Sequence, residues 1–448
     1  MAKYQKYAEY KDSGISWLGE VPSSWKLERF KWIINEKIKT YNSNLPAGAI
    51  SFGEVIYKNE ENLALETKAS YQEVLEGEFL INPLNLNYDL KSLRTALSKI
   101  DVVVSTGYIV VRAHQSLNKK FFRWLLHEFD VAHMKTLGAG VRQTVNFADI
   151  ANCYLYLPSL EEQSQIANFL DHETAKIDHL IEKQQQLIEL LKEKRQAVIS
   201  HAVTKGLDPN VPMKDSGVEW LGEVPEHWIL SNLKYFASIQ GGYAFNSDLF
   251  VEEGTQVLRI GNVYQNTLSL DRQPIYISNE LVKNFKDFIV SKNDVLMSLT
   301  GTLGKRDYGF AIKVKTDEKY LLNQRVAKIS PNLSKIDTDF MVYVLWSESY
   351  LTQLYSLPSG TKQANLSNSD VLGIQIVVPP SLEEQKDIAK YLKNKLLKFD
   401  DMILKAESAI SLMQERRTAL ISAAVTGKID VRNWQAPTLA GAQTELSA

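Results

Sequence analysis

Two stretches of the chain carry apolar residues at nearly every seventh position, over roughly 45 residues each, or about 65 Å of helix at 1.5 Å per residue. This period is typical of a helix that packs against a second helix in a coiled coil. The positions seven apart in the first stretch are Leu170, Ile177, Gln184, Leu191 and Val198, with Ile166, Leu180 and Leu187 predicted to fill the alternate positions of the seam. The corresponding positions in the second stretch are Leu392, Phe399, Ala406, Met413 and Leu420.

Both stretches carry signals for a helix start and a helix end. A serine followed three residues later by a glutamate predicts a capping box, in which each residue satisfies a free backbone N–H group at the start of the helix. These pairs are Ser159 with Glu162 and Ser381 with Glu384. Gly206 and Gly427 follow the last apolar positions and are typical of a helix end.

We expect the two long helices to pair with each other in antiparallel directions, because each carries one apolar stripe that needs a partner. A whole domain separates them in the sequence, so the sequence alone does not determine their relative direction. A coiled coil between two copies of the chain is the alternative.

The regions before each long helix carry strand signals, such as DVVVSTGYIVVRA from Asp101 and TQVLRIGNV from Thr255, separated by Gly, Asn and Pro. Helical pieces follow late in each region. The predicted fold class is therefore α+β: two mixed α/β domains separated by two long helices paired as an antiparallel coiled coil, with a pseudo-two-fold internal repeat. The predicted boundaries are a first domain at 1–157, a first helix at 158–206, a second domain at 207–379, a second helix at 380–428 and a tail at 429–448.

The chain contains an internal repeat. KDSGISWLGEVPSSW from Lys11 returns as KDSGVEWLGEVPEHW from Lys214, an offset of 203 residues, and PSLEEQ from Pro158 returns from Pro380, an offset of 222 residues. The 19-residue difference shows that insertions and deletions accumulated between the matched segments, whose sequences share almost nothing. Tryptophans that recur in both copies are expected to pack in the core rather than to stack on bases; they are Trp17, Trp25, Trp220 and Trp228.

Charge is segregated along the chain. The net charge of −2 over 448 residues argues against a protein that coats nucleic acid without selection. Lys91 to Arg142 contains nine Lys or Arg against three Asp or Glu, and Lys292 to Lys328 contains eight against four. Either basic stretch could also be an ordinary solvated surface. No secretion signal or membrane span is recognised, so we expect the chain to stay in the cytoplasm, away from membranes.

Common catalytic motifs are missing from the sequence. Gly301 to Arg306 (GTLGKR) has the wrong spacing for a nucleotide-binding loop, and Asn82 to Asn85 (NPLN) lacks the second proline and the aromatic residue of an amino-methyltransferase motif. The seven histidines form no grouping with metal-ligand spacing. We therefore expect a non-catalytic protein without cofactor or metal.

The W-L-G-E-V-P-x-x-W segments at Trp17 and Trp220, with the PSLEEQ segments before both long helices, resemble the specificity subunit of type I restriction-modification enzymes over nearly the whole chain. The resemblance implies that the two domains are target-recognition domains, each contacting one half of a bipartite site in double-stranded DNA. It also implies two modification (methyltransferase) subunits docked on the helices, and restriction (motor/endonuclease) subunits as further partners. The first domain departs from the pattern, because it lacks a clear counterpart to Leu258–Asn262.

Candidate DNA-contacting residues lie in the glycine-bounded basic segments. Arg can bind guanine through two hydrogen bonds, and Asn or Gln can bind adenine in the same way. The candidates are Arg94, Arg142 and Gln143 in the first domain, and Tyr243, Lys305, Arg306, Asn323, Gln324, Arg325, Lys362 and Gln363 in the second. An ordinary turn or surface role remains open for each of them taken singly.

Two other classes of protein remain open. The chain could be a scaffold whose coiled coil joins protein partners without DNA specificity, or an enzyme with an unrecognised active site, such as a nuclease. The basic domains favour DNA over protein partners.

Overall fold

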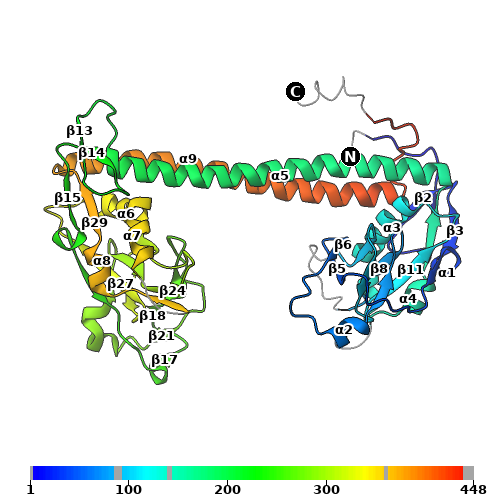
Figure 1. Ribbon diagram of the computed structural model, residues 1–448, viewed down its shortest axis with the longest axis horizontal. Coiled ribbons are helices and arrows are strands. Elements are labelled where there is room, and N and C mark those ends of the chain that lie inside the picture. The colour runs from blue at the N-terminus through cyan, green and yellow to red at the C-terminus, as the bar shows by residue number, and fades with distance from the viewer. Residues whose placement is uncertain (1–3, 85–92, 139–143, 358–361, 437–448) are drawn as a thin grey trace. The chain divides into compact units, whose positions relative to one another are not determined.

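The computed structural model describes residues 4–84, 93–138, 144–357 and 362–436. The chain divides into two compact units. The first unit comprises Met1–Gln184 and Ser408–Ala448, and the second comprises Gln185–Glu407. Each unit contains sheets, short helices and part of both long helices (Figure 1). The predicted α+β class is confirmed.

The long helices are α5 (Leu160–Lys205) and α9 (Leu382–Val425). The predicted N-caps are confirmed, since the backbone N–H groups of Glu162 and Glu384 donate to the hydroxyls of Ser159 and Ser381, at 3.3 and 3.4 Å. Both helices end before a glycine with positive φ, as predicted: Gly206 has φ 76° and Gly427 has φ 73°. Glycine adopts this conformation without the steric penalty that a Cβ imposes.

The two long helices are antiparallel within each unit. In the first unit the beginning of α5 packs on the end of α9, with Arg417 Nε 2.8 Å from Asp178 Oδ1. In the second unit the end of α5 packs on the beginning of α9, with Arg195 Nε 3.3 Å from Asp400 Oδ1. The helices therefore pair within one chain, as expected.

One part of the predicted seam is wrong. Leu180 and Leu187 are exposed, while Ile181 packs against the core of the first unit and Ile188 is buried. From Leu170, a step of eleven residues turns the helix by close to three full turns, about 1,100°, whereas a step of ten residues leaves the side chain about 80° off the seam. The alternate seam positions are therefore the isoleucines that follow the predicted leucines.

Each unit contains a four-stranded antiparallel sheet, and the second unit also contains a five-stranded sheet. The strand order is β4-β11-β8-β9 in the first unit and β16-β27-β23-β25 in the second. The strands of the first sheet are β4 (Ile34–Glu36), β11 (Ile109–Ala113), β8 (Phe79–Ile81) and β9 (Thr95–Leu97). Those of the second are β16 (Ala237–Gly241), β27 (Val326–Pro331), β23 (Val295–Ser298) and β25 (Ala311–Lys313). Most of these strands are rich in Val, Ile, Leu or Phe, which pack well on a pleated surface.

The elements around each sheet also correspond. The elements that recur in both units include two small antiparallel pairs, a helix after the sheet and a short helix that starts with a capping box. In the first unit these are β1 (Tyr10–Asp12) with β2 (Glu20–Pro22), β3 (Lys26–Arg29) with β12 (Tyr154–Leu157), α3 (Lys119–Ala132) and α4 (Phe147–Ala151). In the second they are β13 (Met213–Asp215) with β14 (Glu223–Pro225), β15 (Ile229–Asn232) with β29 (Gln375–Val378), α6 (Thr338–Trp346) and α8 (Asn368–Gly373).

The sequence of the first domain has no clear counterpart to Leu258–Asn262, but its structure contains a shorter counterpart of the strand that leads into this segment. In the second unit β18 (Thr255–Leu258) runs parallel to β26 (Tyr320–Leu322). In the first unit the same parallel contact is a single bridge between Ala47 and Val103, and the N–H of Val103 donates to the carbonyl of Pro46 at 2.9 Å. A contact of one residue leaves too little strand pattern to recognise in a sequence.

Among the described residues, no helix is both long enough and apolar enough to cross a membrane.

Candidate nucleic-acid interface

The repeated tryptophans Trp25 and Trp228 anchor the starts of the long helices. Both side chains are buried, as predicted for core residues, and Trp17 packs partly buried against the core of the first unit. The prediction is wrong for Trp220, which lies in a turn before β14 and is 38% exposed. The indole N–H of Trp25 donates to Glu162 Oε1 at 3.0 Å, and that of Trp228 donates to Glu384 Oε1 at 2.9 Å. The predicted capping boxes are therefore only half formed in the described residues, because the carboxylates of Glu162 and Glu384 accept from the tryptophans rather than from the N–H groups of Ser159 and Ser381.

Each glutamate has a second partner that is not repeated. The Tyr7 hydroxyl donates to Glu162 Oε1 at 2.6 Å, and burial together with this bond raises the pKa of Tyr7. In the second unit His227 Nε2 lies 3.0 Å from Glu384 Oε2. Two bonds fix each carboxylate at the first turn of a helix, where negative charge is favoured by the helix dipole.

The glutamines that follow these glutamates connect the long helices to a helix in each variable domain. Gln163 Oε1 accepts from the N–H of Asn118, the N-cap of α3, at 2.9 Å. Gln385 Oε1 accepts from the N–H of Asp337, the N-cap of α6, at 2.7 Å. Both side chains are buried. The repeated segments therefore hold α3 and α6, the helices that follow the variable sheets, against the long helices by the same bonds.

The second unit brings its eight candidate residues onto adjoining backbone segments. Tyr243 forms a parallel bridge with Asn323, and the N–H of Gln324 donates to the carbonyl of Tyr243 at 3.0 Å. The N–H of Leu299 donates to the carbonyl of Arg325 at 3.0 Å. Leu299 directly precedes β24 (Thr300–Thr302), which pairs with β28 (Gln363–Asn365). Segments distant in the sequence thus form one surface.

The loop between Gly301 and Asp307 carries Lys305 and Arg306. Its carboxylate, Asp307 Oδ1, accepts from the N–H of Thr302 at 2.7 Å. Burial works against ionisation, but these hydrogen bonds keep the pKa of Asp307 below its usual value. A Cβ at Gly301 would lie 2.4 Å from the same oxygen, so only glycine allows this close approach. The loop is therefore held as a closed turn.

The candidates of the second unit differ in whether their side chains are free or bonded within the protein. Lys305, Gln324, Arg325, Lys362 and Gln363 are exposed. Within the described ranges, neither the guanidinium of Arg325 nor the amine of Lys362 has a hydrogen bond or ion pair. These groups are available for a ligand.

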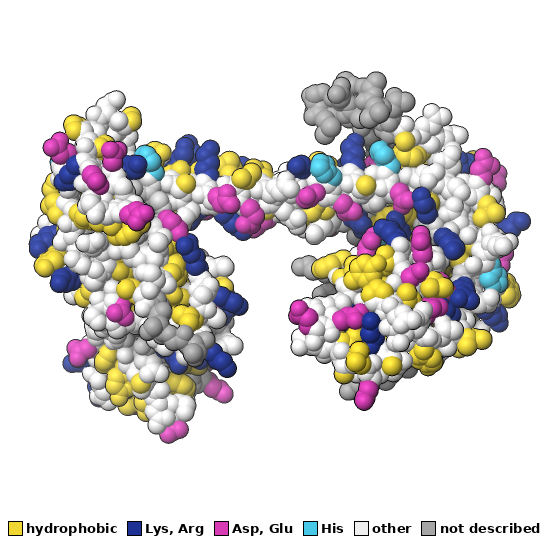
Figure 2. Space-filling view, in the orientation of Figure 1, with side chains coloured by type: hydrophobic (Ala, Val, Ile, Leu, Met, Phe, Trp, Pro, Cys, Tyr) yellow, Lys and Arg dark blue, Asp and Glu magenta, His cyan; other side chains and the backbone are white. Residues whose placement is uncertain are grey.

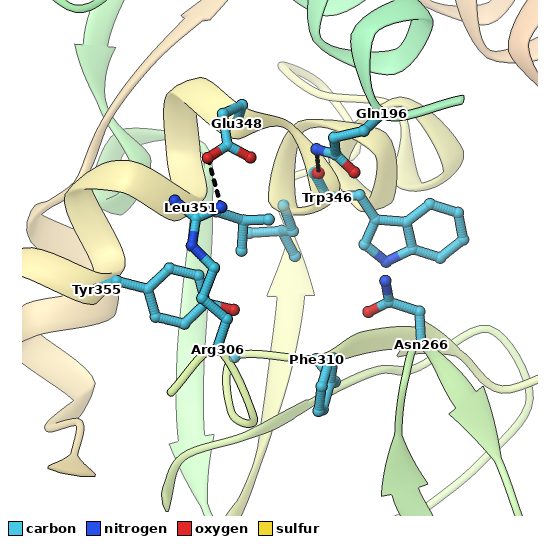
Figure 3. Close-up of a pocket in the computed structure, with 10 residues that line it drawn as sticks. Gln196, Asn266, Arg306, Phe310, Trp346, Glu348, Leu351 and Tyr355 are labelled. Atoms are coloured by element: carbon cyan, nitrogen blue, oxygen red, sulfur yellow. Dashed lines mark hydrogen bonds and ion pairs between the residues drawn. The ribbon is translucent and has the colours of Figure 1, made fainter. Parts of the chain in front are cut away.

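Arg306 differs from Arg325 because its guanidinium is engaged. Its Nη1 lies 2.5 Å from Glu348 Oε1, and the group stacks over the ring of Tyr355 at 5.1 Å. Figure 3 shows this pair at the edge of a pocket of about 250 Å³. There Gln196 donates to the carbonyl of Trp346 at 2.6 Å. We therefore assign Arg306 to the packing of the loop on α7 (Glu348–Ser356) rather than to base contact.

The candidates of the first unit are placed differently. Arg94 is buried, and its Nε lies 3.0 Å from Asp130 Oδ1. Burial raises the pKa of Asp130, against the effect of its bonds with Arg94. Because this pair lies in the interior, Arg94 is a structural residue and we remove it from the expected DNA contacts. Arg142 and Gln143 lie outside the described residues.

Comparison of equivalent strands in the two units identifies further candidate DNA contacts in the first unit, which the sequence did not indicate. Lys39 follows the edge strand β4, and its Nζ donates to the carbonyl of Thr106 at 3.2 Å. Thr106 lies in the turn between β10 (Val102–Val104) and β11, which corresponds to the turn of Asn323–Arg325 between β26 and β27. Lys39 and Thr106 also line a pocket of about 420 Å³. No sequence signal marks them, since the equivalence appears only once the strands are paired.

The surface chemistry suits hydrogen-bonded recognition. Figure 2 shows Lys and Arg side chains along the side of the second unit on which Figure 1 labels β24. Arg, Lys, Asn and Gln present donors that can pair with base edges and phosphates. In the described ranges, no three His, Cys, Asp or Glu side chains are grouped to hold a metal ion.

The fold is that of a duplicated α+β protein. Its two sheets differ in sequence, and the same repeated segments hold the helix that follows each sheet against the long helices. A family model of the type I restriction modification DNA specificity domain matches residues 93–190 and 225–406. These ranges cover more than half of the chain. The chain belongs to this family.

Relatives are similar over nearly their whole length. The type I restriction enzyme MjaVIII specificity subunit of Methanocaldococcus jannaschii is 26% identical over 92% of this chain and 95% of its own. The putative MjaX specificity subunit of the same organism is 25% identical over 96% and 99%. A chain in a solved structure, concerned with complex assembly and conformational transition of the type I R-M system, matches with a TM-score of 0.66. It is 16% identical and covers 90% of this chain and 98% of its own. This last likeness supports the fold.

Proposed function

We propose that this chain is the DNA-specificity subunit of a type I restriction-modification complex, and that each unit recognises one half of a bipartite site in duplex DNA. The observation that carries the proposal is that two sheets of the same strand order carry different side chains on equivalent turns. Base-edge contacts must differ between two half-sites, whereas the positions of the sheets need not. The family match supports the same conclusion.

The proposed contacts are the sequence candidates without Arg94 and Arg306, which are engaged within the protein, and with Lys39 added. In the second unit they are Tyr243, Lys305, Asn323, Gln324, Arg325, Lys362 and Gln363. In the first unit they are Arg142 and Gln143, together with Lys39. We propose that Lys residues contact mainly phosphates, while Gln324 and Arg325 contact base edges.

The proposed partners are two modification (methyltransferase) subunits and, through the assembled complex, restriction (motor/endonuclease) subunits. Exposed apolar side chains on the long helices support docking of the modification subunits, since such groups gain from burial against a partner. They include Leu180, Leu187, Leu190, Leu397 and Leu404. We further propose that the chain is not itself catalytic and acts in the cytoplasm, where its target DNA lies.

Exchange of the first variable region tests the proposal. Residues 30–157 are replaced by the same region of a relative, and methylated adenines are mapped by single-molecule sequencing in cells that carry the complete system. We expect one half of the methylated site to change and the other half to stay, because the second unit is untouched. A change in both halves would contradict independent recognition.

The same complexes distinguish the scaffold alternative. In gel-shift competition with the modification subunits present, the proposed function requires preference for duplexes that contain the mapped site. Equal competition by all duplexes would show a scaffold without DNA specificity.

A further inference from the structure

Each unit exposes a large apolar side chain two residues beyond the end of its edge strand, β4 or β16. The last backbone bond between the edge strand and its neighbour runs from Lys37 N–H to Val110 O at 2.8 Å in the first unit. In the second unit it runs from Gly242 N–H to Val326 O at 3.1 Å. The next residues are Ile38, which is 88% exposed, and Tyr243, which is 41% exposed.

The backbone before each of these residues is immobilised, by different means in the two units. Lys37 is buried, and its Nζ lies 2.9 Å from Glu78 Oε2 and 3.2 Å from Glu73 Oε1. At Gly242 a Cβ would lie 2.1 Å from the carbonyl oxygen of Asn323, so the two backbones are in direct contact. A side chain held out from a fixed backbone loses little entropy when it binds.

The ring of Tyr243 packs against three phenylalanine rings. Its ring centroid lies 5.1 Å from Phe245, 5.1 Å from Phe285 and 5.2 Å from Phe288. These distances suit aromatic packing and leave one part of the tyrosine ring facing solvent. The platform therefore presents the ring without allowing it to fold back into the core.

Lysine, arginine or amide side chains lie beside each of the two residues. Ile38 is followed by the exposed Lys39, which contacts the turn at Thr106. Tyr243 is bonded to Gln324, next to the unengaged Arg325. A rim of cations and amides around one apolar side chain complements a polyanion with a stacked interior, and duplex DNA has this chemistry.

Single exposed apolar residues are common and need no explanation by themselves. Here the position recurs in two sheets whose sequences share almost nothing, beside the turns proposed to contact bases. We propose that Ile38 and Tyr243 are wedges, each of which enters a base step of its own half-site and partly unstacks it. An apolar wedge of this kind kinks the duplex and brings more of it against the protein. This inference rests on the proposed function.

The test uses the complex of the full chain with its modification subunits, on duplexes that carry the mapped site. The fluorescent base 2-aminopurine, whose emission rises on unstacking, is placed at successive steps of one half-site at a time, away from the methylated adenine, which a methyltransferase itself takes out of the stack. We expect a rise in each half-site with the wild-type complex. Ile38→Ala should abolish the rise in the half read by the first unit, and Tyr243→Ala the rise in the other half. Each should weaken binding by about tenfold, the loss expected for one stacking side chain.

Conservative variants and matched controls separate wedging from folding. Ile38→Leu and Tyr243→Phe should keep both the signal and the affinity, because the apolar group remains. Leu65→Ala, at 84% exposure in the first unit, and Tyr235→Ala, at 55% in the second, should change neither. If Tyr243→Ala proves unstable to heating, the Ile38 variants carry the test.

Several outcomes would overturn the inference. Site-specific binding by the wild-type complex without any rise in 2-aminopurine emission would exclude wedging in both halves while leaving the proposed function intact. A loss in Tyr243→Phe equal to that in Tyr243→Ala would show that the hydroxyl, through a phosphate contact, is what matters. Absence of any sequence preference in the wild-type complex would instead reject the proposed function.

Discussion

Arginine side chains in the basic segments divide according to their partners within the protein. Arg94 is buried against Asp130, and Arg306 pairs with Glu348, whereas the Arg325 guanidinium is exposed and without a partner among the described residues. All three belong to basic stretches in the sequence. Charge composition therefore located the segments, and only the tertiary contacts identified which guanidinium is available.

Removal of Arg325 should change which bases are recognised. Arg325→Ala is expected to relax the preference at one base pair of the second half-site, with a loss of about 1–3 kcal/mol in binding, as for a bidentate base contact. Arg306→Ala is the matched control and should keep the base preference, because that side chain is engaged with Glu348. The check is competition binding against every single-base variant of the site. A uniform loss over all variants would indicate that Arg325 contacts phosphate.

At the scale of elements, the ends of the long helices are specified by nearby residues, but the bonds that attach them to the rest of each unit are not. The caps at Ser159 and Ser381 follow from residues within one turn, and the structure confirms them. The bonds from Trp25 to Glu162 and from Trp228 to Glu384 join segments that are 137 and 156 residues apart. The repetition of both segments in the sequence indicates that they are structurally important, but it does not show that they contact each other.

Loss of the indole N–H group should weaken these attachments unequally. Trp25→Phe is expected to lower the free energy of unfolding by about 1–3 kcal/mol, because Glu162 is 8% exposed and would lose a bond in the interior. Trp228→Phe should cost less, since the Glu384 side chain is 32% exposed and water can replace the bond. Urea unfolding followed by circular dichroism measures both values.

Trp17→Phe is the control for the change in ring size. The Nε1 atom of Trp17 is buried and has no hydrogen-bond partner in the described part of the chain. Its loss should therefore cost less than Trp25→Phe. An equal cost for both variants would show that ring packing, rather than the bond to Glu162, determines the effect.

At the scale of the whole molecule, the two units share a strand order that their sequences conceal. The counterpart of β18 in the first unit is reduced to the bridge between Ala47 and Val103. Both long helices contain residues of both units. Helix length is therefore a property by which one chain could determine the spacing of its two half-sites.

Lengthening both helices tests this role. Seven residues are inserted after Gln184 in α5 and after Glu407 in α9, at the limits of the two units, which keeps the seven-residue phase of the seam. The insertion adds about 10 Å of helix, or about three base pairs of B-DNA. We expect the spacer of the methylated site to lengthen by that amount, as read by sequencing of methylated adenines. Replacement of seven residues without a change in length should leave the spacer as it was, and an unchanged spacer in the longer protein would reject the role.

The sequence by itself determined the long helices with their caps, the repeated segments and the α+β class. These depend on hydrogen bonds and apolar periods within a few turns of chain, so nearby residues suffice to specify them. Tertiary structure alone decided the burial of Arg94, the exchange of Leu180 for Ile181 in the seam and the equivalence of Ile38 with Tyr243. Each of these depends on the pairing and packing of residues distant along the chain, which a local pattern does not encode.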